Sequence, residues 1–180
     1  ASWTRVFAPD QPPNVTCIAQ DPRAGRSNIW YCGTGEIKGG NMVAGSGVNE
    51  YQGRGIMKSI DNGMTWLPLN ATLSGSPVDN EIFDYVNNVV VGDDGVVYAA
   101  LKDVIVESYD GGNEWYYATN EIQDNKSAFT DVAKGPDGVI YATLGHTNQH
   151  GEIVSYLGGI YAKFPGDDQW YLLSSPELGF

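Results

Sequence analysis

The sequence predicts an all-β protein in which four-stranded antiparallel units repeat along the chain. Short alternations of apolar and polar residues recur throughout its 180 residues, and no stretch keeps a helical period for three turns. The chain contains 23 glycines, and 12% of its residues are aromatic, which is typical of turn-rich β proteins. The octapeptide SIDNGMTW (59–66) also returns as SYDGGNEW (108–115), with Ser, Asp, Gly and Trp at identical spacing.

The repeat is longer than the octapeptide. In each unit a short alternating strand leads through a turn into a second strand, which reads IWYCGT, VYAAL or IYATL. A third strand, a tight turn and a fourth strand opening with Trp follow. Four antiparallel strands repeated about every 50 residues predict the blades of a β-propeller. The predicted blades span 14–69, 86–118 and 128–174, and residues 1–7 are predicted as the outer strand of a preceding blade.

Three blades and one strand do not close a ring, because propellers close with about four to eight blades. The sequence therefore predicts one segment of a larger propeller. The remaining blades of that propeller, or a partner chain, are the predicted partners of the exposed sheets.

The octapeptide is predicted to form the hairpin turn between the third and fourth strands. Its Asp is expected to accept hydrogen bonds from backbone N–H groups two residues on, and its Gly to adopt positive φ. Its Ser is expected to bond across the turn mouth, and its Trp to pack between sheets. These structural roles are assigned to Ser59, Asp61, Gly63, Trp66, Ser108, Asp110, Gly112, Trp115 and, in the third unit, Trp170. That unit reads KFPGDDQW and is expected to turn differently.

The octapeptide resembles the Asp-box, or BNR, repeat. The stretch YCGTGE followed by YQGRGIMKSIDNGMTW is similar to sortilin-type and secreted BNR-repeat propellers. The likeness covers nearly the whole chain and implies the propeller fold. The related proteins include sialidases, xyloglucan-specific endoglucanases, sorting receptors and surface proteins of Bacteroidetes. The resemblance therefore implies a secreted or cell-surface location, outside the cytoplasm, but it leaves the activity open.

Strand order sorts the connections onto two faces. The short turns, including the octapeptides, share one face, and the long loops at 34–55, 70–84, 119–127 and 145–159 gather on the other. Long loops on a rigid scaffold are common binding sites, so ligand binding is predicted there. The candidate residues are Glu36, Glu50, Tyr51, Arg54, Asp84, Glu121, His146, His150 and Glu152.

Two functions stay open: a module that binds protein or glycan, or a part of a glycan-processing glycoside hydrolase. Hydrolysis needs two suitably placed carboxyl groups, and no catalytic residue is assigned here. An ion pair between Glu36 and Arg54 that pins the long loop is an alternative to ligand contact. His146 and His150 lack an evident third ligand, so no metal is predicted, and no cofactor either.

The formal net charge is −12, and basic residues form no cluster. Nucleic acid is therefore not expected as a partner. No apolar run reaches the roughly 20 residues that span a bilayer, so membrane insertion is not expected.

Cys17 and Cys32 lie in two predicted neighbouring strands. If Gln20 faces Ile29 across this hairpin, the two cysteines face each other, and a disulfide is possible. Two buried thiols are the alternative.

Overall fold

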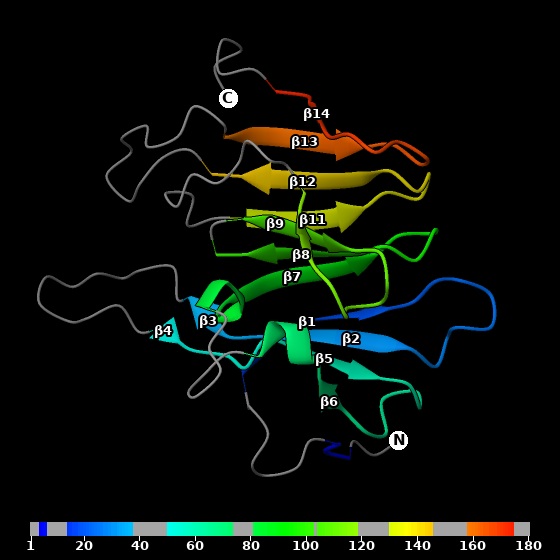
Figure 1. Cartoon of the computed structure of the whole chain (residues 1–180), viewed down its shortest axis with the longest axis vertical. Helices are drawn as coiled ribbons and strands as arrows, with labels where there is room; N and C mark the ends of the chain where they lie inside the picture. Colours follow the sequence, from blue (N-terminus) through cyan, green and yellow to red (C-terminus); the bar gives the residue numbers. More distant parts are fainter. Residues whose placement is uncertain are drawn as a thin grey trace, which may run out of the picture.

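The computed structural model describes residues 4–6, 14–37, 50–73, 81–102, 104–118, 130–145 and 158–174. Its main strands form three four-stranded antiparallel sheets, which confirms the predicted all-β fold of four-stranded units (Figure 1). Within the described ranges the helices are two 3₁₀ turns, η1 (Asn70–Thr72) and η2 (Glu81–Phe83). Neither is long or apolar enough to cross a membrane.

Each sheet runs in chain order from an inner to an outer strand. Sheet 1 contains β1 (Val15–Gln20), β2 (Trp30–Thr34), β5 (Ile56–Ser59) and β6 (Leu67–Pro68). Sheet 2 contains β7 (Val86–Val91), β8 (Val97–Leu101), β9 (Ile105–Ser108) and β10 (Tyr116–Tyr117). Sheet 3 contains β11 (Thr130–Lys134), β12 (Ile140–Leu144), β13 (Gly159–Lys163) and β14 (Tyr171–Leu172). A small hairpin of β3 (Glu36–Ile37) and β4 (Glu50–Tyr51) was not predicted.

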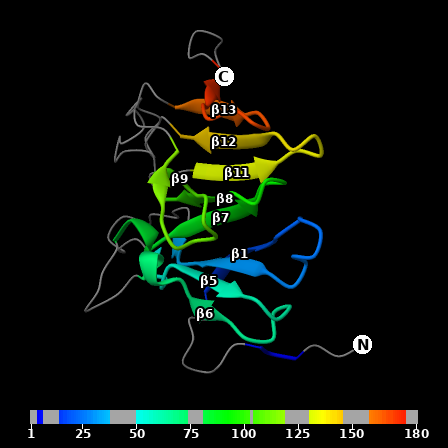
Figure 2. The ribbon, with the colours of Figure 1, turned by 45° about the vertical axis from the view of Figure 1, so that its right-hand side comes forward.

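The three sheets radiate from their inner strands. Sheet 1 extends downward in Figure 1, sheet 3 extends upward, and the outer strands of sheet 2 lie between them, as Figure 2 shows from another side. Side chains join the inner strands: Thr16 donates to the carbonyl of Val86, and Asn88 Nδ2 donates to Asp131 Oδ1 at 2.8 Å. The arrangement is that of neighbouring propeller blades.

Apolar layers fill the two spaces between the sheets. Between sheets 1 and 2 the core includes Tyr31, Ile56, Val89 and Val106. Between sheets 2 and 3 it is formed mainly by Ala100, Ile105, Val132, Ala142, Leu144 and Tyr161. Because strand residues alternate between faces, sheet 2 contributes to both layers and is covered on both sides.

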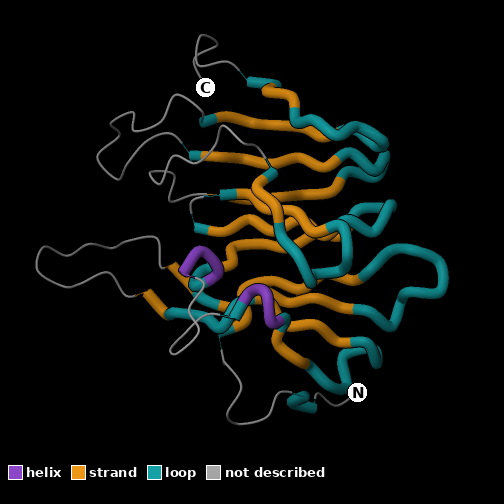
Figure 3. Tube along the Cα trace, viewed as in Figure 1, coloured by secondary structure: helices purple, strands orange, loops and turns teal. Residues whose placement is uncertain are grey.

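The connections separate to the two ends of the strands. The short turns and octapeptide turns lie at one end, on the right in Figure 3, whereas η1, η2 and the β3–β4 hairpin lie toward the other. The described residues thus show the separation of faces that strand order predicted.

The register of the first hairpin differs from the expectation by one residue. Gln20 pairs with Trp30 instead of Ile29, so Cys17 pairs with Gly33 and Cys32 with Ile18. The turn sets this register: the N–H of Asp21 donates to the carbonyl of Ile29 at 3.0 Å. A slip of one residue sends the two cysteine side chains to opposite faces.

The proposed disulfide between Cys17 and Cys32 is therefore wrong, and both cysteines are free thiols. Cys17 packs against the core between sheets 1 and 2, whereas Cys32 packs with Met57 and Trp66 on the other face of sheet 1. Burial raises the pKa of both thiols, that of Cys32 to about 12, so neither is a reactive thiolate near neutral pH.

Candidate functional site

The first octapeptide turn is closed by its own side chains. Ser59 Oγ donates to Asp61 Oδ1 at 2.8 Å and accepts the N–H of Gly63 at 2.9 Å. Asp61 also accepts the backbone N–H of Thr65 at 2.8 Å and its hydroxyl at 2.6 Å. Gly63 has φ 82°, a conformation that favours glycine.

The second octapeptide turn repeats this pattern. Ser108 Oγ donates to Asp110 at 2.9 Å and accepts the N–H of Gly112 at 2.8 Å. Asp110 accepts the N–H groups of Asn113 and Glu114 at 2.9 and 3.0 Å. The bonds to Asp therefore come from residues three and four positions on, and the expectation of two positions on was wrong. The N–H groups two positions on, those of Gly63 and Gly112, donate to the Ser hydroxyls instead.

These bonds stabilise the ionised carboxylates. The hydrogen bond from the Thr65 hydroxyl, followed by that from its N–H, lowers the pKa of Asp61 to about 2. The N–H of Glu114 is the main cause that lowers the pKa of Asp110. Carboxylates held in this way fix the turns rather than exchange protons near neutral pH.

The tryptophans of the repeat pack toward the preceding sheet. Trp115 packs on the core between sheets 1 and 2, with its ring 5.6 Å from that of Phe83. Trp170 packs toward sheet 2, with its ring 5.9 Å from that of Tyr98. Trp66 packs with Cys32 and Met57 on the outward face of sheet 1, so among the described residues it does not lie between two sheets.

The third turn departs from the octapeptide at its Ser, Asp and Gly positions. Lys163 replaces Ser, Pro165 replaces Asp, and Asp167 replaces Gly. The indole N–H of Trp170 is buried without a hydrogen-bond partner in the described structure, whereas those of Trp66 and Trp115 donate to glycine carbonyls. The turn still places its tryptophan against the preceding sheet.

Lys163 uses its position to reach across to sheet 2. Its Nζ lies 2.7 Å from Glu107 Oε2 and 3.3 Å from the hydroxyl of Tyr109, and both charged side chains are buried. Burial by itself lowers the pKa of Lys163, but the bond to Glu107 and its charge outweigh burial and raise it. The pair is therefore a charged clamp between sheets 2 and 3.

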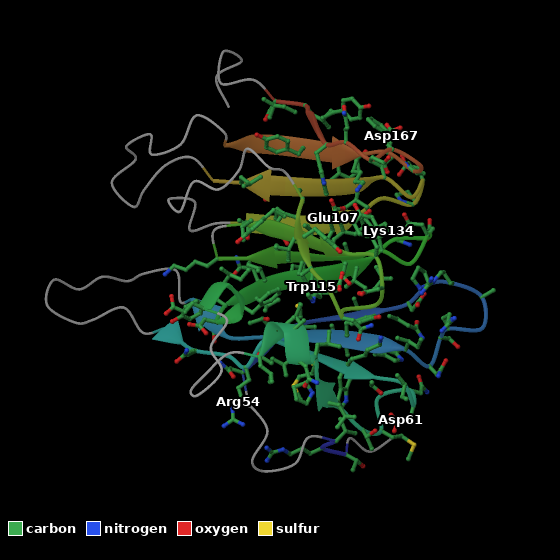
Figure 4. The ribbon with its side chains drawn as sticks, in the orientation of Figure 1. Arg54, Asp61, Glu107, Trp115, Lys134 and Asp167 are labelled. Atoms are coloured by element: carbon green, nitrogen blue, oxygen red, sulfur yellow. The ribbon has the colours of Figure 1, made fainter. Side chains whose placement is uncertain are left out.

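Above this clamp lies a groove of about 310 Å³ on the short-turn face, between sheets 2 and 3. In Figure 4, Asp167 and Lys134 mark this end of the strands, and Arg54 marks the opposite end. We call it the inter-blade groove. Its walls are the β7–β8, β11–β12 and β13–β14 turns, with side chains of Asp93, Asp94, Tyr98, Tyr109, Asp137, Lys163, Phe164, Asp167 and Asp168.

Most carboxylates around the groove already have structural partners. Asp94 and Asp137 accept the N–H groups of Val96 and Val139 in their own turns. Asp93 pairs with Lys134 across the two sheets. Asp167 and Asp168 follow one another in the third turn, so the groove has an acidic rim on a fixed frame.

A second hollow of about 260 Å³ lies at the outer rim of sheets 1 and 2. It is lined by Ala71, Ile82, Phe83, Val106, Trp115, Tyr116 and Tyr117. None of these described residues carries a carboxyl group.

The long-loop candidates are brought together in part. Glu36 and Tyr51 pair across the β3–β4 hairpin, and Ile37 pairs with Glu50, although the side chains of Glu50 and Tyr51 lie outside the described part. Arg54 is exposed, and its N–H donates to Thr34 Oγ1 at 2.8 Å. No ion pair joins Arg54 to Glu36 among the described residues, so the proposed pinning pair is wrong.

Asp84 lies beside the same segment, where its carbonyl accepts the N–H of Gly53 at 2.8 Å. The candidates Glu121, His146, His150 and Glu152 lie outside the described residues. Binding at the long-loop face therefore stays a prediction. Within the described ranges, no group of three or more His, Cys, Asp and Glu residues is arranged to hold a metal ion.

Sequence reasoning missed the inter-blade groove. The signal lay in the third octapeptide, whose Lys163 and Asp167 both line the groove. A lysine that faces the preceding sheet needs an acidic partner on that sheet. Glu107, which directly precedes the Ser of the second octapeptide, is that partner. The sequence assigns only structural roles to the short-turn face.

No protein-family model matches the chain, and no curated protein matches it significantly. Solved structures do resemble it. An ancestral GH74 enzyme is 21% identical over 88% of this chain, with a TM-score of 0.55. The extracellular domain of BT4673 from B. thetaiotaomicron is 8% identical over 94% of this chain, also with a TM-score of 0.55.

This chain spans about a fifth of the length of both proteins, 20% of the first and 18% of the second. A GH74 enzyme from Niastella koreensis is 16% identical over 89% of this chain and 30% of its own, with a TM-score of 0.46. At these identities the likeness concerns the fold alone. The chain has the fold of part of a β-propeller.

Proposed function

We propose that the chain is part of an Asp-box propeller of an extracytoplasmic protein and serves as a binding and scaffold module for protein or glycan. The octapeptide turns support the Asp-box assignment, because both copies share one bonding pattern. One of the similar structures is an extracellular domain, which supports the location. The propeller then provides a rigid frame on which turns and loops present the ligand-contacting groups.

The observation that carries the binding function is the inter-blade groove, whose carboxylates are mostly committed to fixed bonds. Asp94 and Asp137 accept backbone N–H groups in their own turns, and Asp93 pairs with Lys134. The groove therefore presents a fixed acidic surface to a ligand. The aromatic hollow lacks carboxylates among its lining residues. Both hollows suit recognition better than hydrolysis.

A glycoside hydrolase is the alternative. It needs an acid and a second carboxylate about 5–10 Å apart beside a bound sugar. Most long-loop carboxylates that would qualify lie outside the described residues, so this alternative keeps the form of a testable prediction.

The test incubates the purified chain with glycan and peptide arrays and, separately, with xyloglucan and sialoside substrates. We expect saturable binding to one class of array ligand and no release of reducing sugar or sialic acid. The heat-unfolded chain is the control for adhesion through exposed apolar groups. Release of sugar by the folded chain would replace the binding function by the hydrolase, and absence of saturable binding would refute it.

A further inference from the structure

Between sheets 1 and 2, two cationic side chains lie at the short-turn end, in the space that corresponds to the inter-blade groove. Lys58 lies across from Tyr31, and its Nζ donates to the carbonyl of Gly111 in the next octapeptide turn at 2.8 Å. The ammonium also lies 5.2 Å from the centre of the Tyr31 ring. Nearby, Arg23 Nη1 donates to the carbonyl of Asp94 at 3.3 Å. Two cations of sheet 1 thus reach the turns of sheet 2.

The same positions have the opposite charge between sheets 2 and 3. Glu107 lies across from Tyr98, as Lys58 lies across from Tyr31. The β7–β8 turn presents Asp93 and Asp94 in the place of the turn that presents Arg23. Here no cation of sheet 2 reaches the described turns of sheet 3, and the inter-blade groove stays open.

The groove has more negative than positive groups. Lys163, which lines the groove, is paired with Glu107, and Asp93 at the groove's edge is paired with Lys134. Asp94, Asp137, Asp167 and Asp168 line the groove as well, and no described salt bridge neutralises them. Carboxylates gathered in one concave site raise the local concentration of cations.

Aromatic side chains give the groove a wall that suits a long cationic side chain. Tyr109 and Phe164 are exposed and line the groove beside the carboxylates. A cation already packs on these aromatic rings, because the ammonium of Lys163 lies 5.7 and 5.5 Å from the ring centres of Tyr98 and Tyr109. Lysine and arginine bury an apolar stem and keep the charged head near carboxylates or ring faces.

We propose that the inter-blade groove binds an arginine- or lysine-bearing segment of a partner protein, an inference that rests on the proposed binding function. The ligand's cation takes the position that Arg23 takes between sheets 1 and 2, because Lys163 already lies against Tyr98 as Lys58 lies against Tyr31. Its stem packs on Tyr109 and Phe164, and its charge meets Asp167 and Asp168. The volume of about 310 Å³ admits a side chain of this length but not a folded domain. The net charge of −12 steers basic segments toward the chain.

The test measures fluorescence anisotropy of a labelled tetra-arginine peptide with the full chain. Tetra-citrulline, which keeps the shape and loses the charge, is the ligand control. The double variant Asp167→Asn/Asp168→Asn should raise the Kd about fivefold to tenfold, because two charge contacts are lost. Phe164→Ser removes part of the wall without changing charge and should also weaken binding. Added salt should weaken binding of tetra-arginine.

The matched control is Glu81→Gln/Glu114→Gln, which removes two exposed carboxylates that do not line the groove. It should leave the Kd within about twofold. Equal weakening by both double variants, or no weakening by the groove variants, would overturn the proposal. If the arrays detect only neutral glycans, the proposal fails and the binding function stands. If no ligand binds the folded chain, both fail.

Discussion

The third strand of each sheet carries an isoleucine at the same position, but the surroundings of this residue differ. In sheets 1 and 2 it lies in the core between two sheets, whereas in sheet 3 it faces solvent. Ile56, Ile105 and Ile160 occupy the same position in the strand pairing of their sheets. Their side chains are 0%, 4% and 45% exposed, respectively. The residue type is kept, but among the described residues only the first two have a following sheet that covers them.

The opposite faces show the same contrast at the other end of the array. Ile18, Val89 and Val132 are equivalent residues of the inner strands, facing the preceding sheet. Ile18 is 59% exposed, whereas Val89 and Val132 are each 1% exposed. Both outward faces therefore carry side chains suited to an interface. Equivalent apolar residues therefore contribute differently to stability because a neighbouring sheet covers some of them and not others, although their residue types are similar.

The largest effect is expected from breaking the buried clamp between sheets 2 and 3. Lys163→Ala leaves the carboxylate of Glu107 buried without its partner, so we expect a loss of about 3–5 kcal/mol in the free energy of unfolding. Lys134→Ala breaks the more exposed pair with Asp93 and should cost at most about 1 kcal/mol. Urea unfolding measures both.

The double variant Glu107→Leu/Lys163→Met is the control for this prediction, because it removes both charges together. It should recover most of the stability that Lys163→Ala loses. A similar loss in the single and double variants would mean that packing volume, not charge, holds the two sheets together.

A smaller effect is expected from truncating the repeated isoleucine. Ile105→Ala leaves a cavity between two sheets and should cost about 2–4 kcal/mol. Ile160→Ala removes a half-exposed side chain with little cavity and should cost less than about 1 kcal/mol. Thermal unfolding of the two variants compares them, and equal losses would contradict the difference in coverage.

The third prediction concerns self-association of the chain through the outward faces of sheets 1 and 3. Exposed interface residues on two sheets should make the isolated chain self-associate. Ile18→Glu and Ile160→Glu should each weaken association about tenfold or more by placing a charge in the contact. Ile60→Glu alters an exposed residue of the first octapeptide and is the control. Light scattering measures the mass, and a monodisperse wild-type monomer would show that these faces need no cover.

The repeat made the strands and turns predictable from local patterns. Alternation located the strands, and the octapeptide located the turns at Gly63 and Gly112, where positive φ is needed. The first hairpin register was not predictable in the same way. It depends on bonds within the turn, where Asp21 holds Arg23 through two charged contacts. One residue of slip then separated Cys17 from Cys32.

The candidate site was harder to predict than the fold, because it is assembled from two sheets. Tyr98, Tyr109 and Lys163 are far apart in sequence and meet only when sheet 3 packs on sheet 2. Loop length pointed instead to the opposite face, where the backbone brings Glu36 and Tyr51 together. Length indicates where a chain has room for a ligand, whereas the groove follows from the way two sheets meet.

The smallest effect concerns the octapeptide turns and acid. The pKa of Asp61 is lowered from 3.8 to about 2 by its hydrogen bonds from Thr65 and Ser59. A lowered folded-state pKa contributes stability above the unfolded pKa of about 4, and that contribution is lost as pH falls toward 2. Asp61→Asn should therefore be less stable than the wild type at pH 6, with the difference narrowing between pH 4 and pH 2. The urea midpoints of unfolding of both proteins across this pH range measure the difference in stability.

The control is the third turn, which has Pro165 in place of this Asp, so Pro165→Ala should shift the midpoints by a similar amount at every pH. A constant gap for Asp61→Asn would mean that the carboxylate's charge does not stabilise the turn.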